Sequence, residues 1–221
     1  EHHLQDLKDL YEEFPDCGMY CKAYEKKDGS DIIPSEFKNI PNKSPWKGIV
    51  EDYFYSSSRN SIAWTSAVMI PKSTFENIGV FDPEITLGAG EDTDLWIRIA
   101  LQYPVAFSNT ISAVHQLHSD NRISNSNTNT RQFINLDRYN LQAESNSSLK
   151  TFLDLNRYSI AIQYKLVGNS EKATTLIKGI NPKSLNKKQS FLLSQPSIIL
   201  KFLFRVKQIF KTLGIRLSTF S

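Results

Sequence analysis

The sequence predicts a mixed α/β portion followed by an all-α C-terminal tail. In the first part, apolar runs that suit strands alternate with apolar residues at helical three- and four-residue spacing, whereas from residue 131 onward only the helical spacing recurs. Between the two parts, residues 121–130 consist almost entirely of Asn, Ser and Thr and cannot bury apolar surface. We therefore expect a boundary near residue 125. The expected regions are an α/β part at 1–125, a helical region at 126–195 and a basic amphipathic helix within 196–221.

Each element of the first region follows from a local pattern. Leucines at helical spacing predict an amphipathic helix over 3–14, which Pro15 ends and which should pack on a sheet. Residues 19–24 suit a short strand. Residues 62–70 are nearly all apolar or small, which is typical of a strand buried on both faces. A helix over 91–103 carries acidic residues in its first turn. The other expected elements are an irregular loop over 31–48, a short helix from Ser73 or Thr74 to Gly79, and short strands at 105–107 and 111–114.

The second part is expected to be helical to its end. The apolar spacing predicts helices at about 131–144, 150–167, 170–179 and 184–194, followed by a last helix that begins at Ser197.

Charge is distributed unevenly along the 221 residues, although the net charge is only +3. Residues 1–171 carry 16 basic and 23 acidic side chains, whereas residues 172–221 carry 10 basic side chains and no acidic one. Nowhere do about 18 apolar residues follow one another, as a membrane-spanning helix requires. The asymmetry indicates that the two parts meet different surroundings.

The two cysteines, Cys17 and Cys21, stand four residues apart. On one strand their side chains would share a face but lie too far apart to bridge easily, which excludes a disulfide framework. No second Cys or His pair stands at zinc-finger spacing, so ordinary buried thiols are the preferred interpretation. The first residues are polar and do not resemble a secretory leader, and we expect a cytoplasmic protein.

The residues that could take part in catalysis or binding concentrate between Leu87 and Arg98. Gly88, Ala89 and Gly90 form a flexible loop that can approach a ligand closely, and it leads into the helix that carries Glu91, Asp92 and Asp94. Because Asp94 and Arg98 stand four residues apart on one helix face, they can pair. That pairing leaves the carboxylates of Glu91 and Asp92 for other work. A second interpretation is that these two acids only stabilise the positive end of the helix dipole.

Four segments, taken in order, resemble the acceptor-side half of family 2 glycosyltransferases, which have the GT-A fold. The segments are Ser66-Ala67-Val68-Met69-Ile70, Phe75-Glu76-Asn77-Ile78-Gly79-Val80-Phe81-Asp82, Gly90-Glu91-Asp92-Thr93-Asp94-Leu95-Trp96-Ile97-Arg98 and His115-Gln116-Leu117-His118. The resemblance covers roughly residues 1–125. It implies an incomplete GT-A-like, Rossmann-like mixed sheet with flanking helices.

The resemblance also implies roles for individual residues. Asp92 would be the general base of an inverting transfer from a nucleotide-sugar donor to a glycan or lipid-linked acceptor, with Glu91 beside it and the loop Gly88 to Gly90 near the acceptor. His118 matches the histidine of the family's Tyr-Arg-x-His pattern, which implies contact with the donor phosphate or a metal, although His115-Gln116 replace Tyr-Arg. Within the same interpretation, Trp64 could stack on a sugar face of the acceptor or pack in the core.

One part of the family pattern is missing from this sequence. Family members begin with a nucleotide-binding half that ends in an Asp-x-Asp metal motif, and no such motif precedes the first helix here. We expect the chain to belong to a longer transferase. The missing half would bind the divalent metal, Mn²⁺ or Mg²⁺, and the 221 residues alone would be inactive. Asp92 suits its implied task, because an aspartate is ionised at neutral pH and can accept a hydroxyl proton.

The tail predicts an amphipathic helix with a basic face. Large apolar residues from Ile198 to Leu213 share one broad side, basic residues occupy the other, and Leu200 and Phe204 interrupt the basic side. The basic residues of 197–217 are Lys201, Arg205, Lys207, Lys211 and Arg216. Two interpretations stay open: peripheral contact with an anionic membrane, at the inner face of the cell membrane, or docking on the protein itself. Nucleic acid is not expected as a partner, because large aliphatics interleave the basic residues.

Two further function classes remain beside an enzyme. The predicted helices around 150–180 faintly resemble one tetratricopeptide unit, which would make the tail a protein-interaction module. Alternatively, the chain is a carbohydrate-binding module without turnover.

Overall fold

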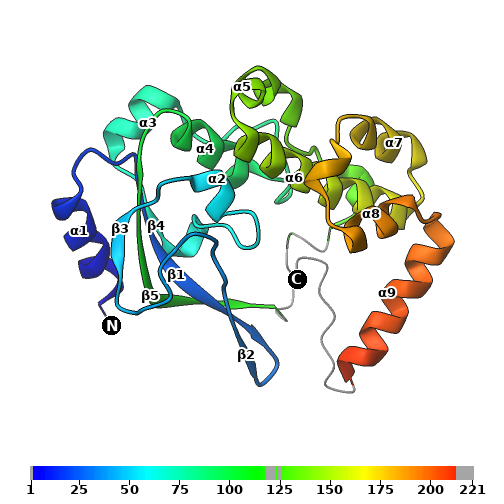
Figure 1. The fold of residues 1–221 in the computed structure, drawn as a ribbon, viewed down its shortest axis with the longest axis horizontal. Coiled ribbons are helices and arrows are strands. Elements are labelled where there is room, and N and C mark those ends of the chain that lie inside the picture. Colours follow the sequence, from blue (N-terminus) through cyan, green and yellow to red (C-terminus); the bar gives the residue numbers. More distant parts are fainter. Residues whose placement is uncertain (1, 118–122, 124–125, 213–221) are drawn as a thin grey trace. The chain divides into compact units, whose positions relative to one another are not determined.

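The computed structural model describes residues 2–117, 123 and 126–212, and their contacts form two units (Figure 1). Unit 1 is Glu1–Ser126 with Gln132–Ile134, and unit 2 is Asn127–Arg131 with Asn135–Ser221. Unit 1 contains both helices and a sheet, whereas the described elements of unit 2 are all helical. The coarse fold class predicted from the sequence, a mixed α/β part followed by a helical part, is confirmed.

Unit 1 is built on a sheet of mixed strand direction. Its elements in chain order are α1 (His3–Glu13), β1 (Met19–Asp28), β2 (Asp31–Pro34), β3 (Lys47–Ile49), α2 (Tyr53–Ser56), η1 (Thr65–Ala67), β4 (Val68–Met69), α3 (Lys72–Ile78), α4 (Glu91–Ala100) and β5 (Val105–Gln116). The strand order is β2-β1-β5-β3, and β4 also pairs with β1. The two long strands, β1 and β5, run parallel side by side, and the other pairs are antiparallel (Figure 1).

Helix α1 packs on the sheet as its leucine spacing predicts. Leu7 and Leu10 are each 1% exposed and form a cluster with Tyr20 of β1 and Ala106 of β5. Burying such side chains stabilises the fold by about 1.5–3 kcal/mol each. A polar contact joins the same layers, because the buried amine of Lys22 binds the carboxylate of Asp6 on α1.

Two predictions for unit 1 were wrong. Residues 31–48 are not wholly irregular, because β2 lies within them and β3 begins at Lys47, and these strands pair with β1 and β5. Residues 62–70 do not form a long strand, since only β4 pairs with the sheet and a 3-10 turn precedes it. Ile62, Ala63 and Ala67 are nevertheless buried. The apolar composition therefore reflects a loop packed into the core, which composition alone does not distinguish from a buried strand.

The other expected elements of unit 1 occur with changed bounds. β1 continues beyond Tyr24 to Asp28, and β5 joins the two short strands expected at 105–107 and 111–114. Helix α3 begins at Lys72, directly after Pro71, and ends before Gly79. Burial of both cysteines is confirmed, and both thiols are free. Burial raises the pKa of Cys17 to about 11 and also raises the pKa of Cys21.

Asparagine side chains start three of the helices in unit 2. Its elements are η3 (Thr128–Thr130), η4 (Leu136–Tyr139), α5 (Asn140–Ser145), α6 (Ser147–Val167), α7 (Ser170–Lys178), η5 (Pro182–Ser184), α8 (Lys187–Ser194) and α9 (Ser197–Thr212). The side chains of Asn146, Asn169 and Asn186 accept hydrogen bonds from backbone N–H groups in the first turns of α6, α7 and α8. Such caps satisfy donors that a helix start otherwise leaves unpaired.

The predicted helices of unit 2 are largely confirmed, with one exception. The expected helix over 131–144 is wrong in its first half, because residues 131–135 have no regular secondary structure and only η4 and α5 follow. The core of unit 2 gathers Tyr158 and Ile162 of α6, Ile180, and Leu200 of α9. Along the described part of the chain, no helix combines the length and apolar character that membrane crossing demands.

Candidate functional site

The loop before α4 depends on glycine geometry. Leu87, Gly88 and Gly90 all have positive φ angles, of 57°, 66° and 105°. At Gly90 a side chain would meet two obstacles, because that φ is strained for L residues and an added Cβ would lie 2.9 Å from Cγ2 of Ile134. The loop thereby delivers the chain into α4 in a conformation that few residues other than glycine adopt.

A segment distant in sequence holds this loop. The backbone N–H of Thr86 donates to the carbonyl of Gln132 at 3.1 Å, and that of Ile134 donates to the carbonyl of Ala89 at 3.1 Å. The N–H of Gln132 also donates to the side-chain hydroxyl of Thr86 at 3.2 Å. Ala89 is buried, whereas Gly88 is exposed. Residues 132–134 therefore fix the loop from one side while its middle reaches solvent.

The predicted pairing of Asp94 with Arg98 is confirmed. Arg98 Nε donates to Asp94 Oδ2 at 2.9 Å, and the Asp94 side chain is fully buried. The other two guanidinium nitrogens donate to the carbonyls of Ile78 and Val80 at 2.7 and 2.8 Å. The pair therefore fastens the end of α3 to α4. Asp94 therefore has a structural role, and Glu91 and Asp92 are the acidic residues of this helix start that remain candidates for function.

Glu91 and Asp92 lie half-buried at the first turn of α4. Asp92 Oδ1 accepts a hydrogen bond from the backbone N–H of Thr93 at 2.6 Å and lies 3.3 Å from the Thr93 hydroxyl. Glu91 Oε2 is buried and has no hydrogen-bond partner among the residues that the structure describes. A buried carboxylate oxygen without a donor is costly, so this position suits a donor supplied from outside the chain.

Sequence reasoning did not single out Tyr53 of α2. This tyrosine is 5% exposed, and burial raises the pKa of its hydroxyl. The negative charge of Asp92 contributes to the same increase, so the phenol lies within electrostatic range of that carboxylate. Asp52 caps the start of α2, because its side chain accepts a hydrogen bond from the N–H of Tyr55 at 2.9 Å. An Asp at a helix start was the available sequence signal, but nothing in the sequence links α2 to α4.

Trp64 and Trp96 lie in different surroundings. Trp64 is half-buried and stacks on His115 of β5, with ring centroids 5.1 Å apart and planes at 27°. It also contacts the ring of Tyr24 at 4.7 Å. Trp96 is 2% exposed and therefore packs in the core, as its apolar neighbours indicate. Trp64 remains a candidate for sugar stacking only through the part of its ring that these neighbours leave exposed. His118 lies outside the described residues.

A cavity of about 260 Å³ lies between β1, β5 and the loop that follows β2. Tyr24, Phe37 and Asn109 are among its lining residues. Asn109 holds the loop, because its side-chain nitrogen donates to the carbonyls of Pro41 and Lys43 at 3.0 and 2.9 Å. The Asn109 side-chain oxygen accepts the backbone N–H of Trp46 at 2.8 Å. The cavity has the size for a small ligand, but the side-chain amide of Asn109, which lines it, is already engaged by the loop.

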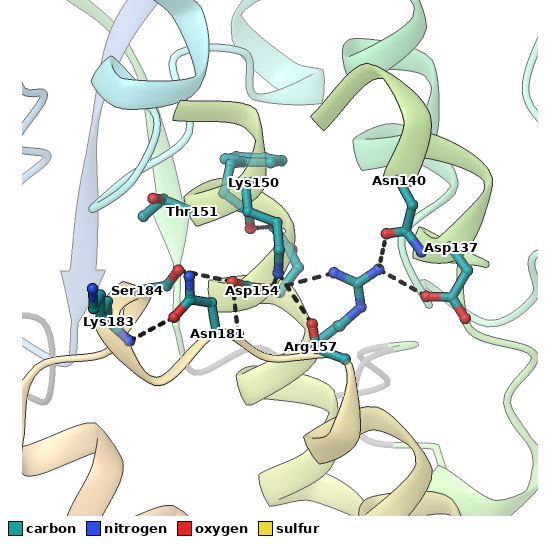
Figure 2. Close-up of polar contacts among 12 residues, drawn as sticks. Asp137, Asn140, Lys150, Thr151, Asp154, Arg157, Asn181, Lys183 and Ser184 are labelled. Carbon is teal, nitrogen blue, oxygen red and sulfur yellow. Dashed lines mark hydrogen bonds and ion pairs between the residues drawn. The ribbon is translucent and has the colours of Figure 1, made fainter. Parts of the chain in front are cut away.

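Unit 2 contains a second concentration of charge, around Asp154 and Arg157 of α6 (Figure 2). The two side chains are 0% and 2% exposed. Asp154 Oδ2 accepts from the Ser184 hydroxyl at 2.7 Å and the Asn181 N–H at 3.1 Å, while Oδ1 receives Lys150 and Arg157. Because donors surround both oxygens, this cluster is a structural network that joins α6 to η5.

Metal ligands do not assemble in the described structure. Within residues 2–117, 123 and 126–212, no three His, Cys, Asp or Glu side chains gather as they would around an ion. Comparison of the chain with protein family models, curated proteins and solved structures gives no match. The site at the start of α4 and the sequence motifs are therefore the features that indicate a function.

Proposed function

We propose that this chain forms the acceptor side of a family 2-like glycosyltransferase. In this proposal Asp92 is the general base, and the sugar passes with inversion from a nucleotide-sugar donor to a glycan or lipid-linked hydroxyl. The finer fold assignment, a GT-A-like sheet without its nucleotide-binding half, belongs to the same proposal. This fold assignment is supported by the order of the four sequence motifs.

The unequal use of three neighbouring carboxylates carries the proposal. Asp94 is buried and bound by Arg98, so it is committed to structure. Glu91 has a buried oxygen without a donor among the described residues, and Asp92 stands next to it. Acids that only stabilised the helix dipole would gain nothing from such burial, since the dipole effect needs no desolvation.

The chemistry assigned to the chain's own residues is proton transfer and positioning. An acceptor hydroxyl beside the glycine loop would donate its proton to the Asp92 carboxylate while its oxygen attacks the anomeric carbon, and the bond between that carbon and the nucleoside diphosphate would break, with the diphosphate leaving on the opposite face. Glu91 would orient that acceptor by accepting a second hydroxyl. When bound, a divalent metal neutralises the leaving diphosphate. The described residues do not supply a ligand set for it, and we assign donor and metal binding to another part of the protein.

The test is the variant Asp92→Asn in the full-length protein. It keeps the side-chain size but cannot accept the proton, so transfer should fall by about 10²- to 10⁴-fold with little change in acceptor KM. Transfer is measured with a panel of radiolabelled nucleotide sugars and a lipid and glycan fraction from the source cells. The matched control is Glu76→Gln, an exposed carboxylate on α3 that pairs with Lys72, one turn earlier in the same helix.

Thermal unfolding of the same variants separates the two interpretations of Asp92. If the carboxylate only stabilises the helix, Asp92→Asn should lower stability by about 0.3–1 kcal/mol and leave transfer unchanged. A transfer rate near that of the unmodified protein would refute the assignment of the base.

A second candidate function, carbohydrate binding without catalysis, is favoured by the cavity beside Tyr24 and Phe37. Calorimetric titration of the chain with free oligosaccharides distinguishes the two. Binding that persists in Asp92→Asn, together with no transfer by the unmodified full-length protein, would favour the binding module.

A further inference from the structure

The last helix docks on unit 2 through only part of its circumference. Leu200 is 0% exposed and lies in the cluster formed with Tyr158, Ile162 and Ile180, and Phe204 packs against the same cluster. These two side chains are the ones that interrupt the basic side of α9 in the sequence. The structure thus gives a reason for their place: they attach the helix to the protein.

Docking through Leu200 and Phe204 leaves a large apolar surface in solvent. This exposed stripe of α9 consists of Ile198 (77% exposed), Ile199 (40%), Phe202 (64%), Ile209 (60%) and Phe210 (38%). At 100° per residue these five side chains fall within about 120° of the helix circumference, away from the docked side. In Figure 1, α9 extends away from α6, α7 and α8, in line with the exposure at its C-terminal half. Five large apolar side chains together are more than scattered surface residues.

Basic side chains border the exposed stripe on both sides. Lys201 and Arg205 follow one another along one edge, and Lys207 lies beyond the opposite edge, next to the Phe204 ring. All three are exposed. No acidic residue occurs after Glu171 in the sequence. The stripe is therefore surrounded by positive charge only.

We propose that the exposed stripe of α9 binds the surface of an anionic membrane, with the helix lying in the plane of the interface. Apolar side chains on one face, with lysine and arginine at its edges, bury in the acyl boundary while the cations contact lipid phosphates. A helix of 16 residues would span about 24 Å of that surface. A second copy of the chain fits less well, because an antiparallel pair of these helices would place like charges side by side.

The test is co-sedimentation of the full chain with vesicles of phosphatidylglycerol and phosphatidylcholine, compared with phosphatidylcholine alone. The double variant Phe202→Ser, Ile209→Ser should weaken binding to the anionic vesicles by at least about tenfold, since two interfacial side chains are lost. Both positions are exposed, so folding of unit 2 should be retained, which circular dichroism checks. The matched control is Leu141→Ser, because Leu141 of α5 is 74% exposed but lies off the stripe.

The charge contribution is tested separately. Lys201→Gln should weaken binding about fivefold, the equivalent of about 1 kcal/mol for one cation at an anionic surface. Raising the salt concentration should reduce the binding of the unmodified chain.

Three results would overturn the proposal. The first is absence of binding to anionic vesicles, and the second is equal binding by the double variant and the unmodified chain. The third is self-association in analytical ultracentrifugation that the double variant abolishes, which would identify a second copy as the occupant.

Discussion

Replacing Asp154 by asparagine tests the buried charge network of unit 2. In the native structure four donors converge on this carboxylate, two on each oxygen (Figure 2). Asparagine has almost the same shape, but one of its two terminal atoms is an NH₂ group. Whichever way the amide is turned, that group faces two donors and can accept from neither. The substitution therefore removes two hydrogen bonds and one charge without creating a cavity.

The expected loss of stability comes from Arg157, which stays buried when the Asp154 carboxylate is removed. Arg157 is 2% exposed, and its remaining carboxylate partner is Asp137, which is 72% exposed and bound at 2.8 Å. Removing one member of a buried ion pair costs about 3–5 kcal/mol, because the other charge stays desolvated. Gly179 limits relaxation, since a Cβ there would already lie 3.1 Å from Arg157 Nε. We therefore expect Asp154→Asn to destabilise unit 2 by about 3–5 kcal/mol.

Urea unfolding followed by two signals measures this effect. All three tryptophans, Trp46, Trp64 and Trp96, belong to unit 1, so their fluorescence reports on that unit, whereas far-ultraviolet circular dichroism includes the helices of unit 2. Asp154→Asn should move the dichroism transition to lower urea. The control is the same chemical change at the exposed partner, Asp137→Asn, which should cost less than about 1 kcal/mol. Equal transitions for Asp154→Asn and the unmodified protein would refute the reasoning.

Three further predictions concern unit 1. Gly90→Ala should destabilise unit 1 by about 2–4 kcal/mol, because the new side chain has a strained φ and also contacts Ile134. Gly29→Ala, at φ 67° in open space, should cost only about 1 kcal/mol. Urea unfolding followed by fluorescence compares the two variants, and equal costs would contradict the prediction. Asp6→Ala should cost about 1–3 kcal/mol because it leaves the buried Lys22 amine without this carboxylate, and a smaller penalty in a Lys22→Met background is the check. The hydrogen bond from Lys22 lowers the pKa of Asp6, so its stabilisation is present at neutral pH and is lost as the pH falls below about 3.8 toward the lowered value; an acid unfolding profile identical in Asp6→Ala would argue against it.

Helices of this fold could be predicted from the sequence better than its strands could. α1, α4 and α6 have periodic apolar faces and recognisable ends, and these local signals survive in the structure. Strand pairing is not local. One edge of β1 is divided between β4, opposite Tyr20 and Cys21, and β2, opposite Glu25 to Asp28. Nothing in the sequence of residues 62–70 indicates that only two of them, Val68 and Met69, pair with this edge of β1.

The contacts of the candidate site could be predicted where both residues are close in the sequence, but not where they come from distant segments. The spacing of Asp94 and Arg98 on one helix face predicts their pair, which also separates the committed carboxylate from Glu91 and Asp92. The proximity of Tyr53 to Asp92 and the support from Ile134 depend on segments about 40 residues away in each direction. Periodicity carries no information about such contacts.

The two units interleave along the chain, and this has a practical result for anyone who wishes to isolate the unit that carries Asp92. The polypeptide leaves unit 1 after Ser126, returns for Gln132–Ile134 and leaves again. A truncation at Ser126, inside the polar segment where a linker is easiest to see, would remove the carbonyl that Thr86 binds and the N–H that Ala89 receives. A fragment ending just after Ile134 keeps both. The hydrogen-bonding partners of the loop, and not the apparent linker, thus decide where such a fragment should end.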